Sequence, residues 1–493
     1  MTGIKKILAA TALVLATSAA AFAARTDLVV GVVLEPPHLD PTAGAAAAID
    51  EVVYANLFEG LTRIDEKGQP QPGLAESWQI SDDGKVYTFK LRSGVKFHDG
   101  SDFNADDVKF SLDRARAENS TNAQKKLFQQ ITAVDVVDPA TVKVTLANPQ
   151  GLFVYNMGLG DAVIVASESA DGNKEKPIGT GPFKFDNWAK GSSIKLTKAE
   201  GYWGAPVALD KVEFRVIPDA AAAVPALLSG DVQAFPMAPV DDALPQLQAD
   251  PRLKVVVGLT EGETILSMNN KKEPFDKLEV RQAVASAIDR KAVIASTMGG
   301  LGQPIGSHMS PANPDYVDLT ATYAYDPAKA KEHLKAAGLA DGFKATLRLP
   351  PTPYARQGGE VIAAQLREVG IDLEIIPVEW ADWLSKVYTD HDFDATVISH
   401  TEANDIDIYA RKGYYIGYDN PAFNKLADEL QIATDAAKRR ELLGQMQTIL
   451  AKDVPAVFLF ELPKIGVWDA KLEGLWENSP IQANDLTKVK WVD

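Results

Sequence analysis

The chain has 493 residues and no cysteine, and its 50 Lys and Arg against 67 Asp and Glu give a formal net charge of −17. The lack of cysteine excludes disulfides, thiolate nucleophiles and cysteine-based zinc sites. The acidic balance, with no basic run, argues against nucleic acid or anionic lipid as a partner. Because a single hydrophobic core stops growing near about 250–300 residues, we expect at least two lobes.

The N-terminal residues predict export. Lys5 and Lys6 precede the apolar run Ile7–Ala16, and small residues lead to an Ala-x-Ala motif that ends at Ala23. This order is typical of a signal peptide, which we expect over residues 1–23. A membrane anchor is the less favoured alternative because the apolar run is short. No later segment holds around 18 uninterrupted apolar residues, so we expect a soluble mature chain.

The first half of the chain predicts a lobe built around short strands. Leu28–Val33 has the composition of a strand and Val52–Leu61 the pattern of a helix. From residue 62 to about 146, short strands alternate with turns, and residues 105–117 form a helix with acids in its first turn. This block predicts a small α/β subdomain. After Gly179 the chain returns to strands, two of which are expected at 253–259 and 264–270.

The second half predicts an alternating α/β lobe. Leu278–Met298 carries apolar residues at helical spacing, and Asp326-Pro327 is an N-cap followed by proline at the first helical position. Further strands are expected at 345–350, 371–378, 395–399 and 456–460, with helices at 328–338, 359–370, 381–387, 422–432 and 436–450. Strands that alternate with helices indicate βαβ units. A last strand at 464–468 is placed to return to the first lobe.

Enzyme motifs are missing from the sequence. It contains no G-x-S-x-G, no H-E-x-x-H and no G-x-x-x-x-G-K-[ST]. Gly179-Thr180-Gly181 precedes a strand, whereas a phosphate cradle needs a helix N-terminus. No two histidines are four residues apart; they are His38, His98, His308, His333, His391 and His400. We therefore predict no catalytic residues, no cofactor and no metal site.

The stretch Asn404–Pro421 sets acids and a guanidinium among four tyrosines. Asp405-x-Asp407 begins like a calcium loop, but such a loop needs an oxygen ligand at position five, glycine at six and glutamate at twelve. Those positions are Tyr409, Ala410 and Ile416. A pair of glycosidase carboxylates needs a wider separation than neighbours on one loop provide. With the calcium and glycosidase interpretations set aside, we interpret this stretch as a loop that follows a strand and recognises a ligand. The alternative is a solvated loop whose tyrosines pack as local core.

A set of motifs in order along the chain carries a resemblance to a known family. The segment from Ser81 to Leu112, SDDGKVYTFKLRSGVKFHDGSDFNADDVKFSL, is the longest of them. The others are Glu35–Pro41, Tyr54–Leu61, Pro72–Trp78, Gly179–Phe183, Tyr202-Trp203, Asn269-Asn270 with Pro274-Phe275, Val280–Ala283 and Tyr418–Phe423. From Leu28 to the C-terminus the chain resembles the extracytoplasmic solute-binding proteins of ABC importers, family 5, the group that binds dipeptides, oligopeptides, nickel and opines.

The resemblance implies a two-lobed α/β periplasmic binding protein fold, class II and cluster C-like, with an extra α/β subdomain in lobe one. We expect lobe one at 24–60, 180–265 and 466–493, the inserted subdomain at 61–179, and lobe two at 266–465. The hinge would fall near Leu266–Asn270 and Phe460–Val467.

The resemblance also assigns ligand-binding residues. In the family's dipeptide binders an arginine meets the ligand carboxylate and an aspartate its amine; Arg356 and Asp405, or Asp407, match these positions. Ile406 and Ile408 depart from the family's pattern around the aspartate. The remaining expected contacts are Trp380, Trp383, Tyr409, Tyr415 and His400 from lobe two, and Glu35 and Tyr54 from lobe one.

The function implied is a periplasmic receptor, not an enzyme, that captures a small polar organic solute such as a short peptide, an opine or another amino-acid conjugate. It would act as a monomer and deliver the solute to a permease and ATPase complex in the inner membrane. Two alternatives stay open: an exported hydrolase, and a solute sensor or chaperone that uses the same fold without transport.

Overall fold

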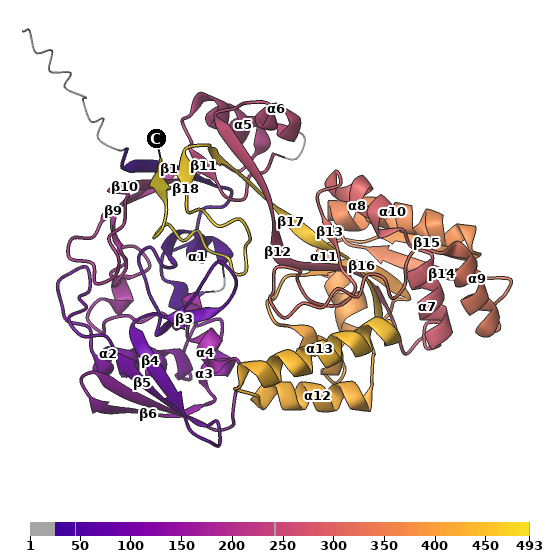
Figure 1. The fold of residues 1–493 in the computed structure, drawn as a ribbon, viewed down its shortest axis with the longest axis horizontal. Coiled ribbons are helices and arrows are strands. Elements are labelled where there is room, and N and C mark those ends of the chain that lie inside the picture. Colours follow the sequence, from indigo (N-terminus) through magenta and orange to yellow (C-terminus); the bar gives the residue numbers. More distant parts are fainter. Residues whose placement is uncertain (1–24, 45, 241–242, 493) are drawn as a thin grey trace, which may run out of the picture.

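The computed structural model of this protein describes residues 25–44, 46–240 and 243–492, so the expected signal peptide lies outside the described residues. Two lobes are joined by the long strands β12 (Leu253–Met268) and β17 (Ala456–Asp469) (Figure 1). One eleven-stranded sheet runs through both lobes in the order β15-β14-β16-β12-β17-β11-β1-β10-β9-β8, with β13 paired to β17. None of the described helices is both long and apolar enough to cross a membrane.

Lobe one is built around β1, the first strand expected from the sequence. β1 runs parallel to β10 and β11, and β9 and β8 continue the sheet in antiparallel. Leu28, Val30 and Val32 are buried in the core, because alternate residues of a strand share one face. The strands and helices of this part are β1 (Asp27–Val32), α1 (Ala47–Val53), β8 (Phe183–Ala189), β9 (Ser193–Lys198), β10 (Lys211–Val216), α5 (Ala220–Ser229), β11 (Ala234–Phe235) and α6 (Leu244–Gln248).

The prediction of a helix over Val52–Leu61 is wrong in its bounds, because α1 begins at Ala47 and ends at Val53. The backbone turns at Ala55, whose φ is 56°. The amides of Leu57 and Phe58 both donate to the carbonyl of Val53, at 2.9 and 3.1 Å, which folds these residues back under the helix. Both side chains are fully buried. Their burial in the core outweighs the helical pattern of the local sequence.

The expected inserted block has its own four-stranded antiparallel sheet, in the order β4-β5-β7-β6. Tyr87, Phe89 and Leu91 of β5 face the core of this sheet. Helix α2 covers it and begins at a capping box in which Asn104 and Asp107 satisfy each other's backbone amides. The elements are β2 (Thr62–Ile64), β3 (Pro70–Pro72), β4 (Ala75–Ile80), β5 (Val86–Leu91), α2 (Ala105–Arg116), α3 (Lys125–Phe128), β6 (Ile131–Asp138), β7 (Thr141–Leu146) and α4 (Phe153–Asn156).

Lobe two has the βαβ arrangement expected from the sequence: β14 pairs in parallel with both β15 and β16. The stretch Leu278–Met298 forms two helices, because Asp289 caps a new helix with its side chain. The expected helix at 381–387 is a short turn that continues as a π-helical turn over Trp383–Thr389. The elements are α7 (Leu278–Ser286), α8 (Arg290–Met298), β13 (Gln303–Pro304), α9 (Pro327–Ala336), β14 (Phe343–Leu349), α10 (Pro353–Glu368), β15 (Ile371–Pro377), α11 (Trp380–Asp382), β16 (Ala395–His400), α12 (Pro421–Ile432) and α13 (Ala436–Asp453).

We call β12 and β17 the crossover strands. The two strands expected at 253–259 and 264–270 form the single strand β12, which pairs antiparallel with β17 along its length. The register between the crossover strands shifts between Leu259 and Glu263. Such a bulge bends a strand and increases its twist. It lies where the sheet passes from one lobe to the other.

The lobes also meet away from the crossover strands. The amide of Gly151 in the inserted block donates to the carbonyl of Gln431 at the end of α12, at 2.7 Å. In Figure 1, α12 and α13 reach toward this block from lobe two. After β17 the chain stays with lobe one, where the short strands β18 (Leu472–Glu473) and β19 (Lys490–Trp491) pair and where Asp485 forms an ion pair with Arg63.

Candidate functional site

The carboxyl ends of β14, β15 and β16 lie at one edge of the lobe-two sheet, because these strands run parallel. In open α/β sheets this edge is where ligands bind. Arg356 follows β14, Trp380 follows β15, and His400 ends β16 just before Asp405. The topology therefore brings these expected residues to one edge, although they come from three separate segments.

Arg356 lies in the first turn of α10 and is anchored by its own lobe. Its Nε donates to the carbonyl of Pro350 at 3.0 Å and its Nη2 to the carbonyl of Val378 at 2.9 Å. Nη2 also lies 3.8 Å from Oε1 of Glu379. These bonds fix the guanidinium across the ends of β14 and β15. About a third of the side chain remains exposed.

The two tryptophans differ in exposure. Trp380 is 42% exposed, whereas Trp383 is buried and its Nε1 donates to Oγ1 of Thr396 at 3.0 Å. Their ring centroids are 6.0 Å apart with an edge-to-face geometry. Trp383 thus supports Trp380 from beneath, and of these two described indoles Trp380 is the one with an exposed aromatic surface.

Asp405 is buried and paired with a histidine far away in the sequence. Its Oδ1 lies 2.9 Å from Nε2 of His308, and its Oδ2 lies 3.9 Å from Nδ1 of His400. Burial opposes ionisation of this carboxyl, but the charge and hydrogen bond of His308 prevail and lower its pKa. The pKa of His400 is lowered to about 4 by burial and by the neighbouring His308. His400 is therefore neutral at pH 7.

Tyr409 and Tyr415 are buried around these histidines, as the alternative interpretation of the loop expects. The Tyr409 hydroxyl lies 3.3 Å from Nδ1 of His308, and the Tyr415 hydroxyl lies 3.0 Å from Nε2 of His400. Both side chains are at most 2% exposed. They hold the imidazoles in place and pack as core, so a contact with solute would need the loop to open.

Asp407 faces solvent, in contrast to Asp405. Its Oδ1 lies 3.0 Å from Nη2 of Arg411, one helical turn further on, and about half of its side chain is exposed. Exposed pairs of this kind contribute little because water screens them. Of the two aspartates, Asp405 alone belongs to the buried polar group at this edge.

The expected lobe-one residues are engaged inside their own lobe. Oε1 of Glu35 accepts hydrogen bonds from Nε1 of Trp188 at 2.8 Å and from the amide of Gly191 at 2.7 Å. The buried Tyr54 hydroxyl donates to the carbonyl of Gly158 at 2.7 Å and accepts from the amide of Ile64 at 2.8 Å. Tyr54 thereby ties α1 to the inserted block, and we leave it out of the proposed site.

Sequence reasoning missed a set of buried acids on the crossover strands. Glu263 of β12 lies directly between His400 of β16 and Glu461 of β17 in the ladder. Residues directly opposite each other share one face of a sheet, so these three side chains form a row. Glu263 and Glu461 are at most 3% exposed. We call Glu263, Glu461, His308 and Asp405 the crossover cluster.

Unlike Asp405, the glutamates of the crossover strands are held neutral by their surroundings. Burial, together with neighbouring carboxylates, raises the pKa of Glu261 to about 8, that of Glu461 to about 9, and that of Glu263 well above its usual value. One feature of the sequence indicates that two of these acids lie together. Glu261 and Glu263 are two apart in the strand region TEGETILSM, where alternate residues share a face.

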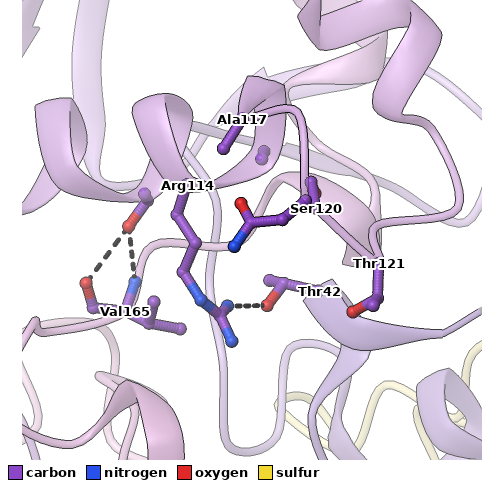
Figure 2. A pocket seen from close by; sticks show the side chains of 9 residues that line it. Thr42, Arg114, Ala117, Ser120, Thr121 and Val165 are labelled. Atoms are coloured by element: carbon purple, nitrogen blue, oxygen red, sulfur yellow. Dashed lines mark hydrogen bonds between the residues drawn. The ribbon is translucent and has the colours of Figure 1, made fainter.

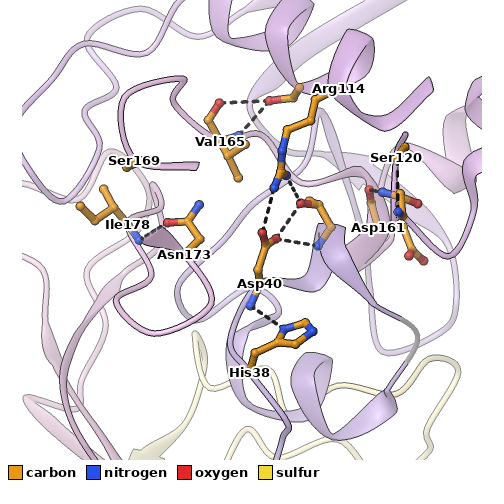
Figure 3. Close-up of polar contacts among 12 residues, drawn as sticks. His38, Asp40, Arg114, Ser120, Asp161, Val165, Ser169, Asn173 and Ile178 are labelled. Carbon is orange, nitrogen blue, oxygen red and sulfur yellow. Dashed lines mark hydrogen bonds and ion pairs between the residues drawn. The ribbon is translucent and has the colours of Figure 1, made fainter. Parts of the chain in front are cut away.

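A separate cavity of about 360 Å³ lies in lobe one, beside Arg114 of α2 and the loop after it (Figure 2). Nη2 of Arg114 lies 3.1 Å from Oδ2 of the buried Asp40 (Figure 3), and its Nη1 donates to Thr42 (Figure 2). Oδ1 of Asp40 accepts from the Thr42 hydroxyl at 2.6 Å. The charge of Arg114 is thus matched within the lobe, and the cavity has no unmatched guanidinium to hold an anion.

The fold and this edge define a class of protein, the two-lobed solute-binding receptors. Residues 69–421 match the model of the bacterial extracellular solute-binding proteins, family 5. This match covers more than half of the chain, and the chain belongs to this family. The resemblance seen in the sequence is confirmed, as is the periplasmic binding protein fold, and the function is that of a solute-binding receptor of ABC importers.

Several relatives support this assignment. The dipeptide-binding protein of Escherichia coli is 33% identical over 438 residues, which cover 79% of this chain and 80% of the relative. HbpA2 from Haemophilus parasuis superposes with a TM-score of 0.86 at 25% identity, covering 94% of this chain and all of that one. DppA from Helicobacter pylori, a periplasmic binding protein in complex with the peptide STSA, gives a TM-score of 0.73 at 28% identity over 95% and 98% of the two chains. The Escherichia coli and Helicobacter pylori relatives are binding proteins by name.

Proposed function

We propose that this receptor captures a short peptide or a similar amino-acid conjugate between its lobes and passes it unchanged to a permease and ATPase complex in the inner membrane. The observation that carries this proposal is the grouping of an anchored guanidinium, an exposed indole and a buried aspartate at one edge of lobe two. Two named relatives bind dipeptides or a peptide, which supports the same class of solute.

Arg356 is suited to hold the carboxylate of such a solute. Its Nε and Nη2 are engaged with backbone carbonyls, and no hydrogen bond of Nη1 occurs within the described part of the chain. A guanidinium that is already oriented loses little side-chain entropy when a carboxylate binds it. Trp380 would cover the apolar part of the solute, and Asp405 would attract its amine.

Closure would take place at the crossover strands. We propose that the hinge lies at the bulge between Leu259 and Glu263 and at the facing part of β17, slightly before the position expected from the sequence. The boundaries of the lobes on either side would lie near those expected from the sequence, with the start of lobe two moved to the bulge, and each side has its own buried core. Solute contacts made only when the lobes close would shift the population toward the closed form.

Calorimetry with one dipeptide and two modified forms tests the proposal. We expect the free dipeptide to bind more tightly than its N-acetyl form, which lacks the amine, and than its amide, which lacks the carboxylate. Arg356→Ala should weaken binding of the free dipeptide but leave binding of the amide unchanged, because the lost partner is the carboxylate. Arg367→Ala, on the exposed side of the same helix, is the matched control.

Two results would contradict this assignment. Equal loss of affinity for the free and amidated dipeptides in Arg356→Ala would show that Arg356 acts only through the fold. Failure of every peptide to bind would remove the peptide class itself. Mass spectrometry of the recovered solute distinguishes a receptor, which returns it intact, from an exported hydrolase.

A further inference from the structure

The crossover cluster contains the donor set of a metal site. One nitrogen of His308 and one carboxylate oxygen each from Glu263 and Asp405 all lie within 4.8 Å of one another, and all three residues are buried. From this geometry we propose that these three side chains bind a divalent transition-metal ion such as Zn²⁺. The proposal goes beyond solute capture, because it needs no organic solute.

Two acids of the cluster, Glu263 and Glu461, lack the partners that buried carboxyls normally have. Within the described residues, Oε2 of Glu263 and both carboxylate oxygens of Glu461 have no hydrogen-bond partner. Two donors beside Glu461 have other partners: the amide of Gly262 donates to Oγ1 of Thr260 at 3.0 Å, and that hydroxyl donates to the carbonyl of Leu462 at 2.9 Å. Buried polar atoms are satisfied in most native proteins, so orphaned oxygens at a His–Asp pair point to a missing ligand.

The spacing of the donors fits a compact ion. Nε2 of His308 and Oδ1 of Asp405 are 2.9 Å apart, close to the about 3.3 Å that separates two ligand atoms of a tetrahedral ion with bonds of about 2.0 Å. Imidazole nitrogen and carboxylate oxygen are common ligands of Zn²⁺. Three protein ligands leave a fourth position for water or for a donor atom of a solute.

The second ring nitrogen of His308 has the support that metal-bound histidines usually have. Nδ1 lies 3.3 Å from the hydroxyl of Tyr409, which is itself fully buried. If Nδ1–H donates to this hydroxyl, Nε2 presents its lone pair to the ion. His400, whose Nδ1 lies 3.9 Å from Oδ2 of Asp405, borders the site on the next strand.

Charge and burial at the crossover cluster suit a metal ion. Glu461 faces Glu263 across the ladder and adds a third carboxyl beside the three proposed ligands. A divalent ion would be balanced by the carboxylates of Glu263 and Asp405 once Glu263 releases its proton to solvent, because a ligand carboxyl must be deprotonated. His308, Asp405, Glu263 and Glu461 are at most 6% exposed, so an ion bound here would be shielded from bulk water.

The location gives such an ion a role in the junction between the lobes. Of the three proposed ligands, Glu263 belongs to a crossover strand and is paired with Glu461 on the other, while His308 and Asp405 come from loops of lobe two. An ion held by these segments would tie the strand bulge to the loop that contains Asp405. We therefore expect metal binding to stabilise the protein toward heat through mass action on the folded state.

Titration of the EDTA-treated full-length mature protein with Co²⁺ and Zn²⁺, in the absence of any solute, tests the proposal. We expect one equivalent to bind, with visible d–d absorption of Co²⁺ typical of nitrogen and oxygen ligands, and Zn²⁺ to displace it. Glu263→Gln and His308→Gln should weaken binding by more than the about 10–100-fold that loss of an outer ligand partner causes. Glu374→Gln and His333→Gln, which lie elsewhere in lobe two, are the matched controls.

Circular dichroism of each variant separates loss of the site from loss of the fold. Binding of less than one equivalent to the folded wild-type protein would overturn the proposal, and so would equal affinity in folded Glu263→Gln and in Glu374→Gln. Because no peptide is present, a negative result here leaves the peptide proposal standing, and failure of peptides to bind leaves this one standing.

Discussion

In lobe one, Arg114 reaches Asp40 and Thr42, and the carboxyl of Asp40 is matched by a cation and a hydroxyl. At the crossover strands, Glu263 and Glu461 are equally buried, yet three of their four carboxylate oxygens have no partner in the described residues. The first network is complete without a ligand and serves the fold. The second is incomplete, and a buried site that is left incomplete is a place where a ligand can contribute binding energy.

The largest effect expected from this comparison is the loss of stability in Asp40→Ala. The substitution leaves Arg114, less than a third exposed, without its counter-charge. Removing one partner of a buried pair costs about 3 kcal/mol or more of unfolding free energy. Urea unfolding measures it. A loss below about 1 kcal/mol would mean that water replaces Asp40 and that the lobe-one network is not structural.

The opposite sign is expected at the crossover cluster, where Glu461→Gln should stabilise the metal-free protein. Burial and the nearby Glu261 raise the pKa of Glu461 to about 9, so the folded protein keeps a proton that the unfolded chain releases above about 4.5. The wild-type protein therefore loses stability as pH rises from about 4.5 to 9, and glutamine removes this loss.

Unfolding in EDTA at pH 5 and pH 8 checks the sign. We expect Glu461→Gln to exceed the wild type by several kcal/mol at pH 8 and by much less at pH 5, because each pH unit between the unfolded and folded pKa values changes the stability by about 1.4 kcal/mol. A variant that is less stable than the wild type at pH 8 would show that Glu461 has a stabilising partner.

The smallest effect is expected at Asp407, the exposed neighbour of Asp405. Asp407→Ala removes an ion pair with Arg411 that water screens, and the unfolding free energy should change by less than about 0.5 kcal/mol. Thermal unfolding at low and high salt measures this change. A larger loss would mean that the 406–410 turn depends on this pair and that the two aspartates are less different than their burial indicates.

The sequence predicted the parts of the fold that depend on local pattern. Short stretches of sequence are enough to predict three features: the alternating burial of β5, the N-cap and proline at the start of α9, and the βαβ order of lobe two. The end of α1 was missed because Leu57 and Phe58 fold back into a core assembled from distant segments. The sequence predicted two strands where the single strand β12 forms. β12 is continuous because it pairs on both sides of its bulge with β17, which lies far along the chain.

The residues of the candidate site also fall into two groups: those that a sequence motif identifies and those that only the fold brings together. Arg356, Trp380 and Asp405 could be named because each follows a strand in a recognisable motif. His308, Glu263 and Glu461 could not, because no motif surrounds them and their proximity arises from register across three strands and a loop. Tyr54 and Glu35 have the right motifs, yet their polar atoms are already bonded within lobe one.

Small-angle X-ray scattering with and without a saturating dipeptide tests the central claim, that this protein closes around a peptide-like solute at the crossover strands. The account predicts a smaller radius of gyration for the saturated protein, and no such change for Arg356→Ala at the same peptide concentration. An unchanged radius of gyration, at a concentration where calorimetry shows the wild-type protein to be saturated, would contradict it.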